Sequence, residues 1–270
     1  MILEKYILKE VEKGDVGFCP MLFLGYPDLE TSKKAISIIE ELGYTVFHTG
    51  IPVNYGFPVT DPLASVSVRL NCSVAFRHVT AEDVLQYFSN IRPNLLTVFP
   101  TTIATGKNAL EIFFEKISGK IDSALIPGAL LPQRSRKELW ELSQSYKIDV
   151  LGSADPTMNS EELNENVRYA EGFIYLRGAS SSNYGVSMYP LGLIQAAIDA
   201  IKKKTDTPIG VGVGMKTPEE VRATASLEGC DMVILATEMM MRLNWGLTAL
   251  RDYVTAVKAA IKDVKKGRAV

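Results

Sequence analysis

The chain has 270 residues, 47% of them hydrophobic, and a formal net charge of −2. A chain of this length and composition can bury a large core, which excludes a disordered protein. The balance of charges excludes a basic footprint for nucleic acid, and no apolar run approaches the roughly 18 residues of a membrane-spanning helix.

The N-terminus and the cysteines indicate a cytoplasmic protein. Residues 1–15 mix both signs of charge and lack the basic region and apolar core of a secretory signal. The three cysteines, Cys19, Cys72 and Cys230, are far apart in sequence, which favours reduced thiols over disulfides or a cysteine metal site. The sequence has only two histidines, His48 and His78. We therefore expect no metal site.

Short apolar strands and amphipathic helices alternate along the whole chain. A helix over residues 2–12 precedes the first strand. Eight strands are predicted, at residues 18–24, 45–49, 95–99, 123–126, 149–151, 173–176, 209–213 and 232–235. The helices that follow them are predicted at residues 28–41, 80–91, 106–119, 134–146, 159–169, 191–203, from 217 onward, and 247–264.

Two helix starts carry specific signals. Thr80, with Asp83 three residues later, is typical of a capping box, in which each side chain bonds the other residue's backbone N–H. Pro218 directly follows Thr217, and the first turn of a helix is where proline is tolerated.

The alternation of elements predicts an α/β fold, a single (β/α)₈ TIM barrel over residues 1–270 with an extra N-terminal helix. A doubly wound open sheet is the alternative. That fold normally has a glycine-rich fingerprint after its first strand, and Gly25-Tyr26-Pro27 is not one.

In such a barrel the functional site lies at the carboxyl ends of the strands. Gly214 lets the backbone approach an anion closely, and Ala236 with Thr237 is placed to open a short helix whose N–H groups favour negative charge. These two loops predict a phosphate site. The expected phosphate ligands, which include two residues of the serine-rich loop after the sixth strand, are Ser182, Gly185, Gly212, Gly214, Ala236 and Thr237. The alternative is that Gly212 and Gly214 only relieve crowding inside a small barrel.

Three further side chains are candidates for catalysis. His48 ends the second strand and titrates near neutral pH, so it suits a general acid or base; the alternative is a histidine bonded to a neighbouring carbonyl. Asp61 lies in the loop after that strand, where forming a turn before Pro62 is the alternative role. Tyr175 in the sixth strand either contacts a ligand or is a core aromatic residue.

Several segments together resemble the alpha subunit of tryptophan synthase. These are residues 23–32 (FLGYPDLETS), 49–52 (TGIP), 61–64 (DPLA), 122–126 (DSALI), 172–175 (GFIY) and 212–220 (GVGMKTPEE). The resemblance implies a barrel that splits indole-3-glycerol phosphate into indole and glyceraldehyde 3-phosphate by a retro-aldol step. It also implies a phosphorylated small molecule as ligand, no cofactor in this chain, and a tryptophan synthase beta subunit as partner.

The chain departs from the family where the resemblance places the two catalytic carboxylates. His48 stands in place of a glutamate, and Ser65 in place of an aspartate, across a loop lengthened by residues 54–60. Gly128 replaces a third carboxylate, Ala236 and Thr237 replace the Gly-Ser that holds phosphate, and residues 99–106 also differ from the family's pattern.

Three hypotheses follow from these departures. The first is a lyase of the tryptophan synthase alpha type, acting on indole-3-glycerol phosphate or a related phosphorylated substrate. The second is a homologue without lyase activity that binds a phosphorylated ligand. The third is a different sugar-phosphate aldolase or isomerase that uses His48 and Asp61.

Overall fold

Two parallel sheets close into one barrel in the computed structural model, which describes residues 2–12, 15–44, 46–50, 79–91, 93–97, 108–126, 135–182, 185–212, 214–262 and 264. The first sheet has the order β1 (Gly17–Pro20), β11 (Met232–Leu235), β10 (Ile209–Gly212), β7 (Ile174–Arg177) and β6 (Gly152–Ala154). The second has the order β2 (Phe47–Gly50), β3 (Asn94–Thr97), β4 (Ser123–Leu125) and β5 (Asp149–Val150).

The two sheets join at both edges. A parallel bridge between Met21 and His48 connects the end of β1 to β2. At the other edge, β5 and β6 are one stretch of chain interrupted only at Leu151. The described strands therefore form a closed ring in sequence order, which confirms the predicted (β/α)₈ barrel.

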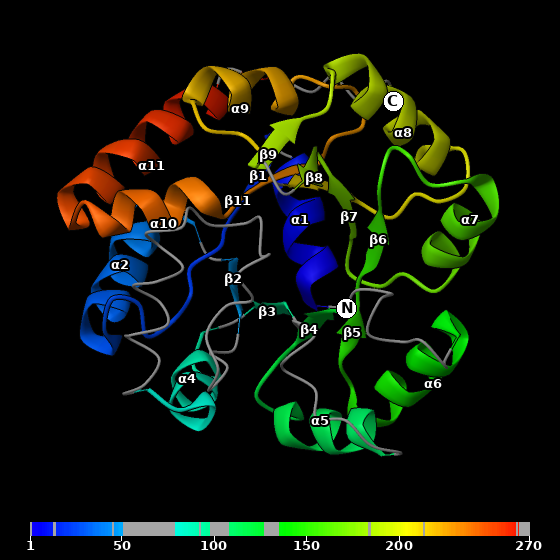
Figure 1. The fold of residues 1–270 in the computed structure, drawn as a ribbon, viewed down its shortest axis with the longest axis horizontal. Helices are drawn as coiled ribbons and strands as arrows, with labels where there is room; N and C mark the ends of the chain where they lie inside the picture. The colour runs from blue at the N-terminus through cyan, green and yellow to red at the C-terminus, as the bar shows by residue number, and fades with distance from the viewer. Residues whose placement is uncertain are drawn as a thin grey trace.

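Helices surround this ring in Figure 1. They are α2 (Leu29–Glu41), α4 (Ala81–Phe88), α5 (Ala109–Ile117), α6 (Arg136–Tyr146), α7 (Ser160–Arg168), α8 (Leu191–Lys202), α9 (Pro218–Ala225), α10 (Thr237–Asn244) and α11 (Leu247–Lys262). The N-terminal helix α1 (Ile2–Glu12) lies over the middle of the ring in this view. None of these helices is long and apolar enough to cross a membrane, as far as the described residues extend.

Both helix-start predictions are confirmed. Thr80 and Asp83 form the expected capping box at α4, and Pro218 occupies the first turn of α9 after the N-cap Thr217. Ser135 and Asn159 cap α6 and α7 in the same way. These caps satisfy backbone N–H groups that have no partner inside the helix.

The structure corrects two predicted segments. The first strand does not run to residue 24, because its ladder ends at Pro20 and Met21 makes only the single bridge to His48. The serine-rich segment after the sixth strand is not a loop. It folds into an antiparallel hairpin of β8 (Ala179–Ser182) and β9 (Gly185–Met188), whose base is tied by the Tyr189 N–H donating to the Gly178 carbonyl.

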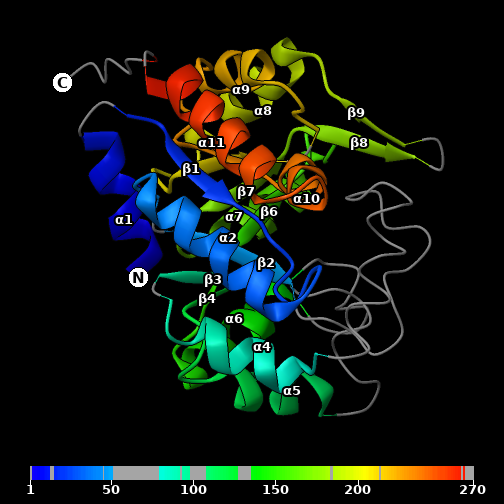
Figure 2. The same cartoon turned by 90° about the vertical axis from the view of Figure 1, so that its left-hand side faces the viewer.

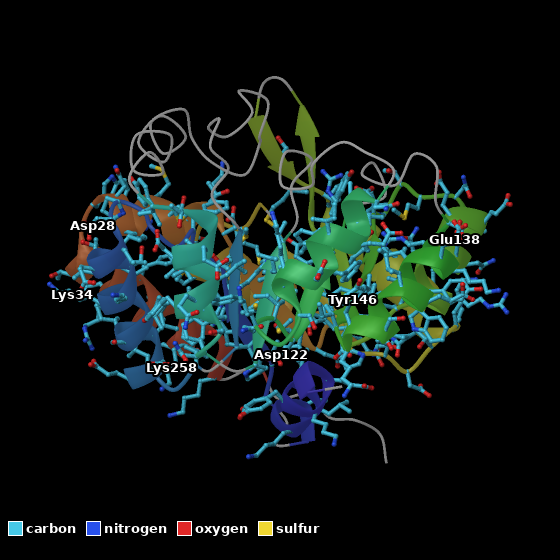
Figure 3. All side chains as sticks on the ribbon, turned by 90° about the horizontal axis from the view of Figure 1, so that it is seen from below. Asp28, Lys34, Asp122, Glu138, Tyr146 and Lys258 are labelled. Carbon is cyan, nitrogen blue, oxygen red and sulfur yellow. The ribbon has the colours of Figure 1, made fainter. Side chains whose placement is uncertain are left out.

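The two ends of the barrel differ. The hairpin stands at the carboxyl end of the strands, and α1 lies across the opposite end (Figure 2). Figure 3 places Asp122, just before β4, toward α1, and Asp28 and Glu138, at the starts of α2 and α6, toward the hairpin.

Alternate residues of each strand divide the core into two clusters. Phe18 and Phe47 point outward and pack in the cluster between the strands and the surrounding helices. The second cluster fills the barrel and includes Leu3, Ile7 and Val11 of α1, so that helix closes the amino end. The other residues of this interior cluster, in the strands or next to them, are Cys19, Val46, Leu95, Leu125, Leu151, Phe173, Tyr175, Met232 and Ile234.

Candidate functional site at the carboxyl ends of the strands

His48 lies inside the barrel. His48 comes from β2, yet the centroid of its imidazole is 6.4 Å from the centroid of the Tyr175 ring. Tyr175 comes from β7, on the other side of the barrel. The imidazole Nε2 is hydrogen-bonded to the Thr97 hydroxyl of β3, and Nδ1 has no partner among the described residues. The partner of His48 is therefore a neighbouring hydroxyl, and not the carbonyl that we considered from the sequence.

Burial decides the charge of His48. The side chain is 2% exposed, and the loss of water lowers its pKa from 6.5 to about 3. The imidazole is consequently neutral at pH 7. A group with so low a pKa is a weak proton acceptor, although a neutral imidazole still offers one hydrogen-bond donor and one acceptor.

Tyr175 and Gly212 face each other inside the barrel. A Cβ on Gly212 would lie 2.5 Å from the Tyr175 Oη and 2.7 Å from its Cζ, so only glycine fits beside this ring. Tyr175 is 7% exposed, and burial raises the pKa of its phenol. The alternative role that the sequence left open for Gly212, relief of crowding, therefore has a physical basis here, while phosphate binding by this residue stays a prediction.

Gly214 has a similar packing role. Its φ of +99° is in the region that favours glycine, and an added Cβ would lie 2.7 Å from the Ala179 Cβ and 2.8 Å from the Met188 Cγ. Ala179 and Met188 are the first pair of the hairpin. Gly214 thus lets the loop after β10 pass close to the hairpin base, which places that loop beside β7.

Ala236 and Thr237 lie where β11 passes into α10. The sequence predicted a short helix here, and α10 begins at Thr237, one residue after the strand ends. Its N-cap is Ala236, whose side chain offers no oxygen to accept from the first-turn N–H groups. β10 and β11 are hydrogen-bonded neighbours, so this helix start and the Gly212 strand end share one edge of the site.

Ser182 and Gly185 lie apart from this group. They are paired with each other at the far end of the hairpin, three residues beyond the Ala179–Met188 pair. At a rise of about 3.4 Å per residue, that separation is roughly 10 Å. The structure thus brings Gly212, Gly214, Ala236 and Thr237 to one region and holds the two hairpin residues away from it along the strands.

A cluster that the sequence did not reveal joins the hairpin to the barrel rim. The Asp155 carboxylate, after β6, accepts from the Tyr189 hydroxyl at 3.2 and 3.4 Å and pairs with Arg177 Nη1 at 3.3 Å. It also accepts from the Thr157 N–H and hydroxyl. The sequence hinted at this cluster only through two charged residues, Asp155 directly after β6 and Arg177 at the end of the neighbouring strand β7.

Other predicted residues fall outside the described part of the chain. These are Asp61, Ser65 and Gly128, together with residues 54–60 and 99–106. Within the described ranges, no three His, Cys, Asp or Glu side chains gather as a metal site requires. A cavity of about 190 Å³ lined by Tyr6, Phe18 and Lys258 lies at the opposite, amino end, so it is separate from this site.

The comparisons with known proteins agree with this architecture. A family model described as tryptophan synthase alpha chain matches residues 8–268. The chain belongs to this family. Among curated tryptophan synthase alpha chains, that of Microcystis aeruginosa is 26% identical over 263 residues, covering 93% of this chain and 95% of the relative. That of Arabidopsis thaliana is also 26% identical, with 92% and 91% covered.

Solved structures of the tryptophan synthase alpha chain family share the fold. A Mycobacterium tuberculosis tryptophan synthase structure superposes with a TM-score of 0.77 at 19% identity, covering 98% of each chain. A tryptophan synthase alpha chain from Legionella pneumophila gives 0.75 at 19% identity, again over 98% of each chain. At this identity the likeness shows the barrel fold alone.

Proposed function

We propose that this chain binds a phosphorylated small molecule at the carboxyl ends of β10 and β11 and cleaves it as a carbon–carbon lyase of the tryptophan synthase alpha type. The substrate is indole-3-glycerol phosphate or a related phosphorylated compound. The observation that carries the proposal is the start of α10 directly after β11, next to the glycines that end β10. Helix N–H groups and the helix dipole both favour an anion at such a place.

The cleavage needs two proton transfers. One group removes the proton from the glycerol hydroxyl beside the ring, which becomes a carbonyl as the carbon–carbon bond breaks. The electron pair of that bond stays on the indole ring, whose carbon takes up a proton from a second group. His48 and Asp61 are the residues that we assign to these two transfers, and Tyr175 lies beside His48 to contact the ring of the substrate.

A second candidate function is ligand binding without cleavage. It is favoured by the burial that lowers the pKa of His48 to about 3, because proton removal from an alcohol by so weak a base is slow. Under this alternative the phosphate site is retained and the lyase reaction is lost.

An indole-release assay separates the two functions. We expect the purified chain to form indole from indole-3-glycerol phosphate, and His48→Ala to abolish the release. If no indole forms while sn-glycerol 3-phosphate still binds, the lyase proposal fails and the binding function remains.

The phosphate site has a matched pair of variants at Thr237. Thr237→Asp puts a carboxylate in the first turn of α10, where it favours the helix but repels phosphate. Thr237→Asn is nearly isosteric and uncharged. We expect affinity for sn-glycerol 3-phosphate to fall at least tenfold in Thr237→Asp and much less in Thr237→Asn, with both variants folded by circular dichroism. Equal affinities of the two variants would show that phosphate does not bind at the start of α10.

Family membership also supports a partner. We propose that the chain associates with a tryptophan synthase beta subunit, because the related chains carry the name of the alpha chain of that enzyme. Co-elution of the two purified chains on a size-exclusion column is the expected result, and separate elution of both contradicts it.

A further inference from the structure

His48 leaves one buried nitrogen without a partner. Its Nδ1 is inside the barrel, and the described residues supply no hydrogen-bonding group to it. Buried polar atoms in proteins are nearly always paired, so an unpaired one points to strain, function or an absent molecule. Whether this nitrogen is a donor or an acceptor depends on which ring nitrogen carries the proton.

Thr97 decides the position of that proton. Thr97 is 7% exposed, and the single hydrogen-bond partner of its hydroxyl within the described chain is His48 Nε2. A hydroxyl has one proton to donate. If the hydroxyl donates its proton to Nε2, that nitrogen is the acceptor and the imidazole proton is on Nδ1. Only the Nδ1–H group is then unpaired.

The opposite arrangement leaves two groups unpaired. If Nε2–H donates to the hydroxyl, neither the hydroxyl proton nor the Nδ1 lone pair has a partner. Each unpaired buried group costs free energy, so the first arrangement is favoured. A doubly protonated ring is disfavoured as well, since burial lowers the pKa of His48 to about 3.

We propose that Thr97 is a positioning residue that holds His48 in the Nδ1–H form, so that His48 is a hydrogen-bond donor to the ligand. The ligand's presence in the barrel rests on the proposed function, in which Asp61 then takes the hydroxyl proton, because a ring nitrogen in the N–H form has no lone pair to accept it. The register of the sheet fixes the pair, because Thr97 lies opposite Gly50 while His48 lies opposite Leu95, two residues earlier on both strands.

This assignment defines the ligand group that meets His48. An ionised carboxylate, which the family resemblance places at this position, only accepts hydrogen bonds and suits a ligand hydroxyl. The Nδ1–H only donates, so the ligand must present an oxygen that accepts, which a carbonyl and a hydroxyl both offer. The donor at this position therefore makes a carbonyl oxygen, which cannot donate to a carboxylate, an acceptable partner.

The tautomer can be read in the ligand-free protein. Long-range ¹H–¹⁵N correlation spectra distinguish a protonated from an unprotonated ring nitrogen, and His78→Gln leaves His48 as the only histidine. We expect a protonated Nδ1 in this background and when Thr97→Ser is added, because serine keeps the hydroxyl. Thr97→Val should release the ring to the other form or to a mixture. A protonated Nε2 in the unaltered site, or no change in Thr97→Val, overturns the role of Thr97.

The ligand class is tested with two probes that differ only at one carbon. Dihydroxyacetone phosphate has a carbonyl where sn-glycerol 3-phosphate has a hydroxyl. We expect His48→Leu to weaken the binding of the carbonyl compound roughly three- to tenfold, because its carbonyl oxygen then loses one hydrogen-bond donor. Unchanged affinity for the carbonyl compound in His48→Leu overturns the donor role of His48.

The role of Thr97 and the donor role of His48 can each be contradicted independently of the proposed function. If neither probe binds, the phosphate site is wrong, whereas the tautomer measured without ligand still tests Thr97. If both bind and the tautomer is Nε2–H, the phosphate site stands and the donor role of His48 is overturned.

Discussion

At the scale of single residues, His48 shows how burial sets chemistry. The same imidazole on a surface would titrate near pH 6.5, and inside the barrel its pKa is about 3. Thr97, which is hydrogen-bonded to its ring, and Tyr175, whose ring faces it, offer no negative charge that would stabilise an imidazolium. The residue type alone suggested a pH-sensitive base, and the environment makes it a neutral hydrogen-bonding group.

The pKa of His48 predicts acid sensitivity. Between pH 6.5 and about 3 the unfolded chain binds a proton at His48 that the folded chain does not, so its contribution to stability is complete above pH 6.5 and is lost as the pH falls. The slope is at most about 1.4 kcal/mol per pH unit from this one group. We expect urea unfolding of the wild type to lose more stability from pH 7 to pH 5 than that of His48→Leu. Parallel losses would contradict the buried pKa.

Gly212 gives a second prediction at this scale. The Cβ of Gly212→Ala would overlap the Tyr175 ring, so we expect a loss of about 1–3 kcal/mol in the free energy of unfolding. In a Tyr175→Leu background the alanine has more room, and the loss should shrink. A double-mutant cycle by urea unfolding measures this coupling, and additive effects would show that the overlap is relieved elsewhere.

At the scale of elements, the sequence predicted what local signals specify. Alternating apolar strands and helices gave the barrel, and the pairs Thr80 with Asp83 and Thr217 with Pro218 placed two helix starts correctly. The hairpin was missed because its strands carry serine and glycine where β-branched residues normally mark a strand. Its fold depends on tertiary contacts with Gly178 and Asp155, which no local pattern encodes.

The candidate site likewise has some features that the sequence predicted and others that it did not. The start of α10 follows from the order of elements in a barrel, so the sequence predicted it, whereas the sequence left open whether Tyr175 is buried. The bond between His48 and Thr97 joins residues 49 positions apart, and it depends on the register between β2 and β3. Register and side-chain pairing of this kind are set by packing across the whole sheet.

The hairpin yields the prediction for this scale. The Tyr189 hydroxyl ties it to Asp155, so Tyr189→Phe should speed amide hydrogen exchange over residues 179–188 without lowering the midpoint of thermal unfolding. Tyr6→Phe is the control, since Tyr6 belongs to α1 at the other end of the barrel. Unchanged exchange in Tyr189→Phe would mean that Arg177 and the backbone suffice to hold the hairpin.

At the scale of the whole molecule, the closing helix α1 and the candidate site occupy opposite ends of the barrel. The carboxyl end carries the hairpin, the loops after β10 and β11, and the start of α10 (Figure 2). The amino end is closed by α1, whose apolar face completes the interior cluster. This division is the usual one in (β/α)₈ enzymes, in which the amino face contributes stability and the carboxyl face function.

The role of α1 as a closure predicts that its buried face can be weakened without changing ligand affinity. Ile7 is 2% exposed and packs with the interior residues of the strands, so Ile7→Ala should cost about 2–5 kcal/mol in the free energy of unfolding. Lys5→Ala, on the exposed face of the same helix, should change it by less than about 0.5 kcal/mol. In the folded Ile7→Ala protein, affinity for sn-glycerol 3-phosphate should equal that of the wild type, because the proposed phosphate site lies at the other end of the strands. Equal unfolding midpoints for Ile7→Ala and Lys5→Ala would show that packing of α1 does not stabilise the barrel. A loss of affinity in Ile7→Ala would show that the two ends of the barrel are coupled.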